Sequence, residues 1–405
     1  MSISTPIVAD HAGIYTFTFE TEGIRATVDR ITEDSKHNVH GEVLITLSTA
    51  LVSTQGHLYR TRLNLLSTSA KKATARLLGE RMDLDWDMIL ESVCHHVLER
   101  HRMGEPVVAL GDVVINDQVK YRVAPLVTDG EHNLLYGDSG IGKSLIAGYL
   151  AFIVSEGILD CGLVPLPGPV LYLDYETSQD VTARRFRAFH VGFALDYAPQ
   201  VLYRFCHQPV AGDIQSIQRA VADNGIQLVI VDSAGPACGG EPESAQSALS
   251  FFAALRSLRC TTLTIAHKAK NHGVGPFGSM FWTAYPRNVY EVKKVQDQGA
   301  SAIHLGLFHR KVNDGELLRP RGFTFAFDGG GVTVSATDMR HIPEFEGELS
   351  TGERLNAILA DGAMSVGDLA TALDVPQSSI SMVFKRNSGE RFCKLPDGRW
   401  GLRAI

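Results

Sequence analysis

The sequence lacks paired cysteines and long apolar runs. Its six cysteines are scattered, with no C-x-x-C pair and no spacing typical of metal ligands. We therefore expect reduced thiols, as in a cytoplasmic protein. No apolar run approaches the roughly 18 residues that a membrane-spanning helix needs, and the first residues lack the basic and apolar regions of a secretion signal. Both absences favour a cytoplasmic protein that has no membrane partner.

The chain also lacks a strong excess of one charge. With 38 Lys and Arg against 45 Asp and Glu, its net charge is −7. This average argues against a protein that coats nucleic acid with its whole surface, although it is compatible with a local basic patch. At about 150 residues per domain, a chain of 405 residues predicts two or three domains.

The first domain is predicted over residues 1–105 as a small α+β unit. Short runs within residues 14–66 alternate apolar and polar side chains, which predicts antiparallel strands. Apolar residues then recur at helical spacing over residues 69–82 and 86–101. We assign this domain to assembly or to the binding of a partner.

The remaining chain is predicted to form an α/β domain, a linker and a third unit. Over residues 106–335 apolar strands alternate with helices, which is typical of a mostly parallel sheet covered on both faces. Later strand-like runs would extend this sheet at one edge. Residues 336–350 are expected to be a linker. Residues 351–405 hold three helical segments and then two short strands, the order of a winged helix-turn-helix.

The strongest motif in the chain is a phosphate-binding loop. The segment GDSGIGKS fits G-x-x-x-x-G-K-[ST] and stands between an apolar strand and a helix. Backbone N–H groups of such a loop surround phosphate oxygens, and the helix N-terminus adds positive charge. Lys143 would reach the β- and γ-phosphates and take part in catalysis, and Ser144 would bind Mg²⁺. The predicted nucleotide-binding residues are Gly137, Asp138, Ser139, Gly140, Ile141, Gly142, Lys143, Ser144 and Leu145.

Two acids at strand ends would complete an ATPase site. Asp232 ends the apolar strand LVIVD, and we expect it to hold Mg²⁺ together with Ser144. Glu176 follows the apolar strand VLYLD, where its carboxylate could polarise the water that attacks the γ-phosphate. A helix-capping role for Glu176 is the alternative.

These motifs together resemble the RecA-type ATPases, in which the catalytic glutamate follows the strand after the phosphate-loop helix. Ser233 stands where AAA+ ATPases carry their glutamate, directly after the Walker B aspartate, and this difference favours the RecA type. The nearest likeness is the group of hexameric replicative helicases that includes RepA and DnaB. The resemblance covers about residues 120–335. It implies a RecA-like fold, ATP and Mg²⁺ as cofactors, and self-association into a hexameric ring that acts on single-stranded DNA.

The resemblance also assigns residues outside the nucleotide loop. His267 ends the strand TLTIAH at the place of the γ-phosphate sensor; an uninvolved strand end is the alternative. Lys268 and Lys270 open a glycine-rich loop at the place of the second DNA-binding loop, and an ordinary surface loop is the alternative. A cation is also expected to reach the γ-phosphate of the neighbouring subunit, and the sequence does not decide among three candidates. They are Arg287, Arg310 and Lys311.

The carboxy-terminal unit is predicted to contact DNA. From residue 377 to the end, six basic residues stand against two acids, which is the electrostatic footprint of a DNA-binding face. The second helix of the helix-turn-helix would meet bases or phosphates. Docking of a protein partner is the alternative. The predicted DNA-contacting residues of this unit are Gln377, Ser378, Ser379, Lys385, Arg386, Lys394 and Arg399.

The sequence therefore predicts an ATP-dependent DNA motor, a ring helicase or translocase that acts in DNA replication or repair. Two alternatives stay open. One is a filament-forming or loader-type repair ATPase with the same chemistry. The other is a DNA-binding regulator whose oligomeric state is switched by nucleotide.

Overall fold

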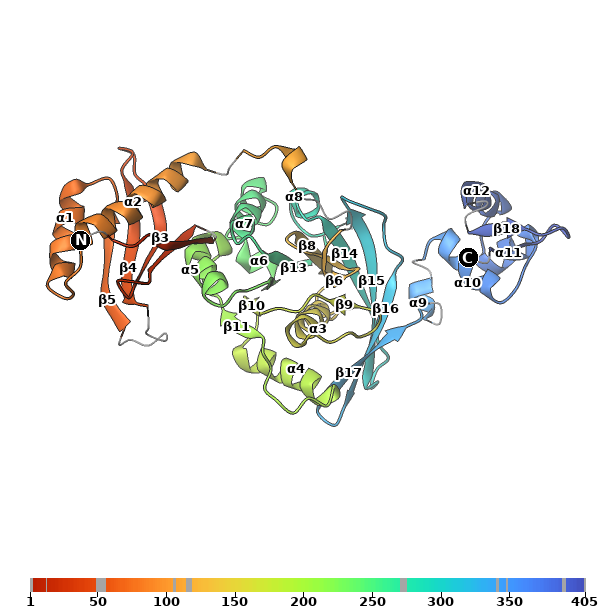
Figure 1. Cartoon of the computed structure of the whole chain (residues 1–405). Coiled ribbons are helices and arrows are strands. Elements are labelled where there is room, and N and C mark those ends of the chain that lie inside the picture. The colour runs from red at the N-terminus through yellow and green to blue at the C-terminus, as the bar shows by residue number, and fades with distance from the viewer. Residues whose placement is uncertain are drawn as a thin grey trace.

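A large central sheet lies between two smaller units, one at each end of the chain, in the computed structural model (Figure 1). The structure describes residues 3–11, 13–48, 56–104, 107–113, 119–269, 275–339, 342–346, 349–387 and 391–403. No described helix is both long enough and apolar enough to cross a membrane.

The amino-terminal unit is an antiparallel sheet with two helices packed on it. Its elements are β1 (Ile7–His11), β2 (Ile14–Phe19), β3 (Ile24–Glu33), β4 (Val39–Leu47), β5 (His57–Asn64), α1 (Thr68–Gly79) and α2 (Trp86–Met103). The strands follow chain order across the sheet. Alternate residues such as Phe17 and Phe19 point to the core beneath α1 and α2, which explains the period of two in the sequence. Strand β1 gave no such signal because all five of its residues are exposed.

The central unit follows the short helix η2 (Leu110–Asp112). Its first half contains β6 (Tyr121–Ala124), β7 (Val127–Thr128), β8 (His132–Gly137), α3 (Lys143–Glu156), β9 (Val164–Pro165), β10 (Val170–Asp174), α4 (Gln179–Gly192), β11 (Leu202–Phe205) and α5 (Val210–Asp223). Its second half contains β12 (Leu228–Asp232), α6 (Ala234–Ala237), α7 (Ala245–Ser257), β13 (Thr261–His267), α8 (Phe281–Ala284), β14 (Asn288–Val295), β15 (Ala302–Val312), β16 (Arg321–Asp328) and β17 (Gly331–Thr337).

The central sheet has nine strands in the order β11-β10-β12-β13-β8-β14-β15-β16-β17. The strands from β11 to β14 run parallel to their neighbours. Strands β15, β16 and β17 continue the sheet in antiparallel fashion. The prediction of an α/β fold with a mostly parallel sheet, extended by β-rich segments at one edge, is therefore confirmed. As a consequence, β8, β10, β12 and β13 all end at one edge of the sheet.

Two apolar cores cover the two faces of this sheet. Along β12, Leu228 and Ile230 point to the core shared with α3 and α4, whereas Val229 and Val231 point to the core shared with α5, α6, α7 and α8. Because both faces are covered, the central strands are apolar at successive positions rather than alternating. The edge strand β11 was not predicted, because its four residues are exposed or only half-buried.

The carboxy-terminal unit contains α10 (Thr351–Ala360), α11 (Val366–Leu373), α12 (Gln377–Asn387), β18 (Phe392–Lys394) and β19 (Trp400–Leu402). Its small core includes Leu355, Leu369 and Phe384. Ser350 and Glu353 form a capping box at the start of α10. The segment before it, predicted as a linker, includes α9 (Pro343–Glu346).

Candidate active site

The phosphate-binding loop joins the carboxyl end of β8 to the first residue of α3. Gly140 and Gly142 have positive φ angles of 73° and 88°, which residues with a Cβ rarely adopt. A Cβ on Gly137 would lie 2.6 Å from the Val292 carbonyl oxygen. The glycines of the motif are therefore needed for the path of the backbone itself.

Lys143 lies buried at the start of α3, with 6% of its surface exposed. Its Nζ donates to the carbonyl oxygens of Gly137 at 3.0 Å and Asp138 at 2.5 Å. Burial lowers the pKa of Lys143, while the carboxylates of Glu176 and Asp232 act in the opposite direction. The ammonium group is thus held within the loop and close to both predicted acids.

Asp232 ends β12 and is almost fully buried, with 3% exposed. The Tyr172 hydroxyl donates to its Oδ2 at 2.5 Å, whereas its Oδ1 is buried without a hydrogen-bond partner in the described structure. Burial raises the pKa of Asp232, and the hydroxyls of Tyr172 and Ser144 partly offset this effect. The free Oδ1 and the nearby Ser144 hydroxyl are oxygen donors of the kind Mg²⁺ prefers.

The described residues contain no cluster of three or more His, Cys, Asp or Glu side chains that could hold a metal by themselves. Mg²⁺ is commonly held by one or two protein oxygens together with substrate phosphates and water. Ser144 and Asp232 are therefore a suitable donor pair.

Glu176 lies in the turn between β10 and α4 and reaches across the edge of the sheet. Its Oε1 accepts a hydrogen bond from the Ser233 hydroxyl and lies 3.6 Å from Nε2 of His267. The residue at the N-cap of α4 is Ser178, so Glu176 does not cap this helix. The ends of β10, β12 and β13 thus bring one acid, one hydroxyl and one imidazole together beside the phosphate-binding loop.

Asp174 holds the turn that carries Glu176, a role the sequence analysis missed. Its Oδ1 accepts from the backbone N–H groups of Glu176 at 3.0 Å and Thr177 at 2.8 Å. Its Oδ2 accepts from the hydroxyls of Thr177 at 2.6 Å and Thr182 at 2.9 Å. Burial alone would raise the pKa of Asp174, but these hydrogen bonds, led by those of Thr177, lower it. The sequence signal for this role was an acid at the end of a strand, Asp174, with a threonine three residues later, Thr177.

His267 ends β13, the strand that lies between β8 and β12 in the sheet. The next residue, Lys268, donates its backbone N–H to the Gly137 carbonyl at 2.9 Å. Its Nζ lies 2.7 Å from Oε1 of Glu291, a buried carboxylate on β14 that the sequence analysis also missed. The predicted DNA-binding Lys268 is therefore engaged within the chain, and Lys270 lies outside the described residues.

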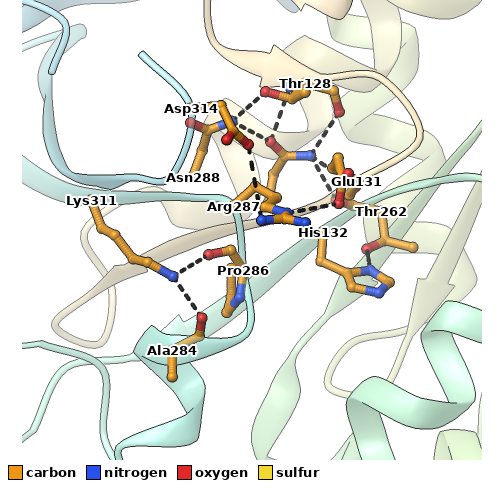
Figure 2. A network of polar contacts seen from close by, with 11 residues as sticks. Thr128, Glu131, His132, Thr262, Ala284, Pro286, Arg287, Asn288, Lys311 and Asp314 are labelled. Carbon is orange, nitrogen blue, oxygen red and sulfur yellow. Dashed lines mark hydrogen bonds and ion pairs between the residues drawn. The ribbon is translucent and has the colours of Figure 1, made fainter. Parts of the chain in front are cut away.

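The three candidate trans-acting cations fall into two places. Arg310 pairs with Glu291, at 2.7 Å between Nη2 and Oε2. In Figure 2, Arg287 and Lys311 lie instead near the start of β14. Arg287 Nε is 3.3 Å from Glu131 Oε2, and Lys311 Nζ donates to the carbonyls of Ala284 at 2.6 Å and Pro286 at 2.7 Å.

The backbone register explains this separation. Val289 pairs with Lys311 and Tyr290 with His309, so Arg310 is the extra residue of a β-bulge. A bulge changes the direction in which a side chain points. Sequence adjacency of Arg310 and Lys311 therefore did not predict their positions.

The predicted DNA-contacting residues of the carboxy-terminal unit lie on α12 and on the β18–β19 hairpin. All are exposed except the half-buried Ser379. Arg399 is paired with Asp397 at 2.7 Å. Lys385 and Arg386 occupy the last turn of α12.

The sheet, the phosphate-binding loop and the strand-end acids define a P-loop nucleotide-binding domain. In agreement, the sequence model of a family described as an AAA domain matches residues 100–273.

Solved structures include a KaiC-like protein from the hyperthermophilic archaeon Pyrococcus horikoshii OT3 that is similar to this chain. The two are 15% identical with a TM-score of 0.38, and the match covers 51% of this chain and 90% of the other. No curated protein matches the chain significantly in sequence.

Proposed function

We propose that the chain is a Mg²⁺-dependent ATPase of the replicative-helicase type, which assembles into a ring of six subunits and couples ATP hydrolysis to movement along single-stranded DNA. The observation that carries the proposal is the position of Glu176. Its carboxylate contacts Ser233 and lies beside His267, next to the loop that holds Lys143. A P-loop that only binds nucleotide does not need a carboxylate at this place.

In the proposed reaction the loop N–H groups and Lys143 bind the β- and γ-phosphates. Ser144 and Asp232 would hold Mg²⁺, which neutralises charge on the phosphates when bound. Glu176 would accept a hydrogen bond from the attacking water and orient its oxygen toward the γ-phosphorus. His267 would respond to loss of the γ-phosphate and pass the change to Lys268 and the loop that follows.

A cation supplied by the neighbouring subunit would complete the site. Arg287 and Lys311 lie together at the amino end of β14, which is the opposite edge of the sheet from the phosphate-binding loop. Groups at opposite edges cannot meet in one subunit but can meet between two subunits. Arg310 pairs with Glu291, which lies opposite Tyr136 near the phosphate-binding loop of its own subunit, so we favour Arg287 and Lys311 for the role in trans.

DNA contact is proposed for the carboxy-terminal unit as a winged helix-turn-helix. Its three helices and hairpin follow the required order, and Lys385, Arg386 and Lys394 are exposed. The loop that contains Lys268 and Lys270 would form the second contact. Both contacts would weaken steeply with rising salt concentration.

Replacement of Glu176 by Gln tests the catalytic assignment. Loss of the carboxylate is expected to lower the ATP hydrolysis rate by about 10²–10⁴-fold, because the water is no longer oriented or activated. Binding of ATP, followed by fluorescence of a labelled analogue, should be retained. The matched control is Glu80→Gln, at an exposed position after α1. Unchanged hydrolysis in the Glu176→Gln variant would show that the assignment is wrong.

Unwinding of a forked DNA duplex by the purified protein, with and without ATP, tests the motor function. Closed rings and ATP-dependent unwinding are expected. Open filaments without unwinding would favour the repair ATPase, and a sequence-specific footprint with negligible turnover would favour the regulator.

A further inference from the structure

A second lysine, Lys294 on β14, contacts the phosphate-binding loop from outside the motif. Its Nζ donates to the carbonyl oxygen of Gly140 at 3.0 Å. Lys143 binds two other carbonyls of the same loop, those of Gly137 and Asp138. Two ammonium groups therefore hold three carbonyls of this loop, and only one of the two belongs to the sequence motif.

The position of Lys294 beside the loop follows from strand pairing. Tyr290 and Val292 of β14 point to the core shared with α3, and side chains alternate along a strand, so Lys294 lies on the same face. Lys294 pairs in register with Leu305 of β15. A Cβ on Gly142 would lie 3.2 Å from the methyl carbons of Leu305. The loop thus rests on β14 and β15, and Lys294 extends this contact.

The hydrogen bond to Gly140 sets the direction of the next peptide group. Because the peptide unit is planar and trans, the Gly140 C=O and the Ile141 N–H point in opposite directions. Gly140 has a φ angle of 73° and no Cβ, so the residue itself does little to restrict rotation of this peptide group. An ammonium group that binds the carbonyl therefore turns the Ile141 N–H away from β14.

That direction leads toward the acids of the site. Strand β14 lies on one side of β8, whereas β12 and β10, which carry Asp232 and lead to Glu176, lie on the other. The Ile141 side chain packs against the core beside α3, and its N–H donates no hydrogen bond to a described residue. A phosphate oxygen between the loop and the acids is therefore a suitable acceptor for this N–H.

We propose that Lys294 is a positioning residue of the nucleotide site, which presents the Ile141 N–H to the β-phosphate by holding the Gly140 carbonyl. The loop of such a site surrounds the phosphates with backbone N–H groups, so the direction of each peptide group matters. The inference deepens the proposed function and rests on its nucleotide-binding step. Direct contact of Lys294 with the γ-phosphate is the competing role.

Binding of labelled ADP and ATP analogues, each with Mg²⁺ and followed by fluorescence, separates these two roles. In the Lys294→Met variant the carbonyl loses its donor, so the dissociation constants for both nucleotides should rise about five- to tenfold. Both should rise because ADP and ATP each carry a β-phosphate. The value of kcat at saturating ATP should stay within about threefold, since the loss affects binding rather than the chemical step.

Lys294→Arg keeps a charged donor of similar reach and should recover most of the affinity. The matched control is Lys293→Met, which removes the neighbouring charge on the other face of β14, where Lys293 lies over the Phe308 ring. Both dissociation constants should stay within about twofold of the wild type in this control. Lys294 is exposed, so its variants should fold, and circular dichroism verifies this. If Lys294→Met does not fold, Lys294→Gln takes its place.

Unchanged affinity of the Lys294→Met variant for both nucleotides would overturn the inference. Weaker binding of ATP alone would overturn it too, because that result indicates contact with the γ-phosphate. An equal loss of affinity in the Lys293→Met control would reveal a general effect of charge and would also overturn it. The proposed function is tested separately. A wild type that binds no nucleotide contradicts both, whereas a wild type that shows the expected binding pattern but does not unwind DNA supports the inference and contradicts the motor function.

Discussion

Burial and neighbouring charge change the behaviour of single residues in this protein, and His132 is the clearest case. It is 8% exposed at the start of β8, and its Nδ1 shares a hydrogen bond of 2.8 Å with the Thr262 hydroxyl. Burial contributes most to its lowered pKa of about 4, followed by Arg256 and Arg287. A lone histidine in an apolar strand carries no such information in the sequence.

The lowered pKa of His132 predicts that acid destabilises the central sheet. In the unfolded chain the imidazole has a pKa near 6.5, so between pH 6.5 and 4 the unfolded state binds more protons than the folded state. Its contribution to stability is fully present above pH 6.5, and about 2 kcal/mol should be lost by pH 5. Hydrogen exchange of the β8 amides, corrected for intrinsic rates, measures this loss.

Replacement of His132 by Asn should remove this part of the pH dependence, because the side chain no longer titrates. The exposed His57→Asn serves as the control and should keep the wild-type profile. Equal pH profiles for the wild type and the His132→Asn variant would contradict the argument.

At the scale of elements, the turn between β10 and α4 shows how one side chain positions another. Asp174 accepts hydrogen bonds from two backbone N–H groups and two threonine hydroxyls of this region. The backbone N–H of Tyr175 also donates to the Asp232 carbonyl at 2.7 Å, which ties the turn to β12. The position of Glu176 therefore depends on hydrogen bonds that Asp174 and Tyr175 make within the chain.

Replacement of Asp174 by Ala should misplace Glu176 and loosen the start of α4. We expect a loss of about 2–4 kcal/mol in stability, since several buried donors lose their acceptor. The hydrolysis rate kcat should fall by about 10–100-fold, because the carboxylate is displaced. ATP binding should change little, since Lys143 and the loop are intact.

Asp174→Asn keeps an acceptor for the backbone N–H groups and should recover part of kcat. Asp180→Ala, at an exposed position in the first turn of α4, is the control. A change in ATP affinity with normal kcat would argue that Asp174 acts on the nucleotide rather than on Glu176.

At the scale of the whole molecule, an ion pair joins the amino-terminal unit to the central domain. Arg219 on α5 contacts Asp29 on β3, whose side chain is only 4% exposed. Oδ1 of Asp29 has no hydrogen-bond partner in the described structure. In Figure 1 the end of the amino-terminal sheet lies beside α5. The position of this unit therefore depends in part on one cation from the central domain.

Replacement of Arg219 by Ala should leave the buried Asp29 charge unpaired and destabilise the contact by about 3 kcal/mol. Hydrogen exchange in β2 and β3 should increase, and the phosphate-binding loop should be unaffected. The double variant Asp29→Asn with Arg219→Ala should recover part of the protection, because no charge is left buried. Equal losses in the single and double variants would show that the pair is not coupled.

Sequence reasoning predicted the centre of the site because its signals are local. The phosphate-binding loop is a continuous segment with a fixed backbone path, and the glycines with positive φ belong to its motif. Asp232 was predicted from its place at the end of an apolar strand, and Glu176 was predicted from its place just after another such strand and from the resemblance to RecA-type ATPases. The start of a helix also depends on a local signal: the Ser365 side chain caps α11 by accepting a hydrogen bond from the N–H of Asp368, three residues later.

Tertiary structure alone decided how distant segments meet. The sequence by itself determined the α/β class, the loop and its two acids, because each depends on residues within one strand and turn. Strand order, the bulge at Arg310 and the burial of Glu291 depend on the register between strands. As a result, Arg310 lies apart from Arg287, and Lys268 pairs with Glu291. The cavity of about 340 Å³ at the amino end of the central sheet likewise exists only where the end of α7, the helix α8 and the start of β14 come together. Neighbouring positions in the chain do not reveal such contacts, because side-chain direction and burial are set by packing.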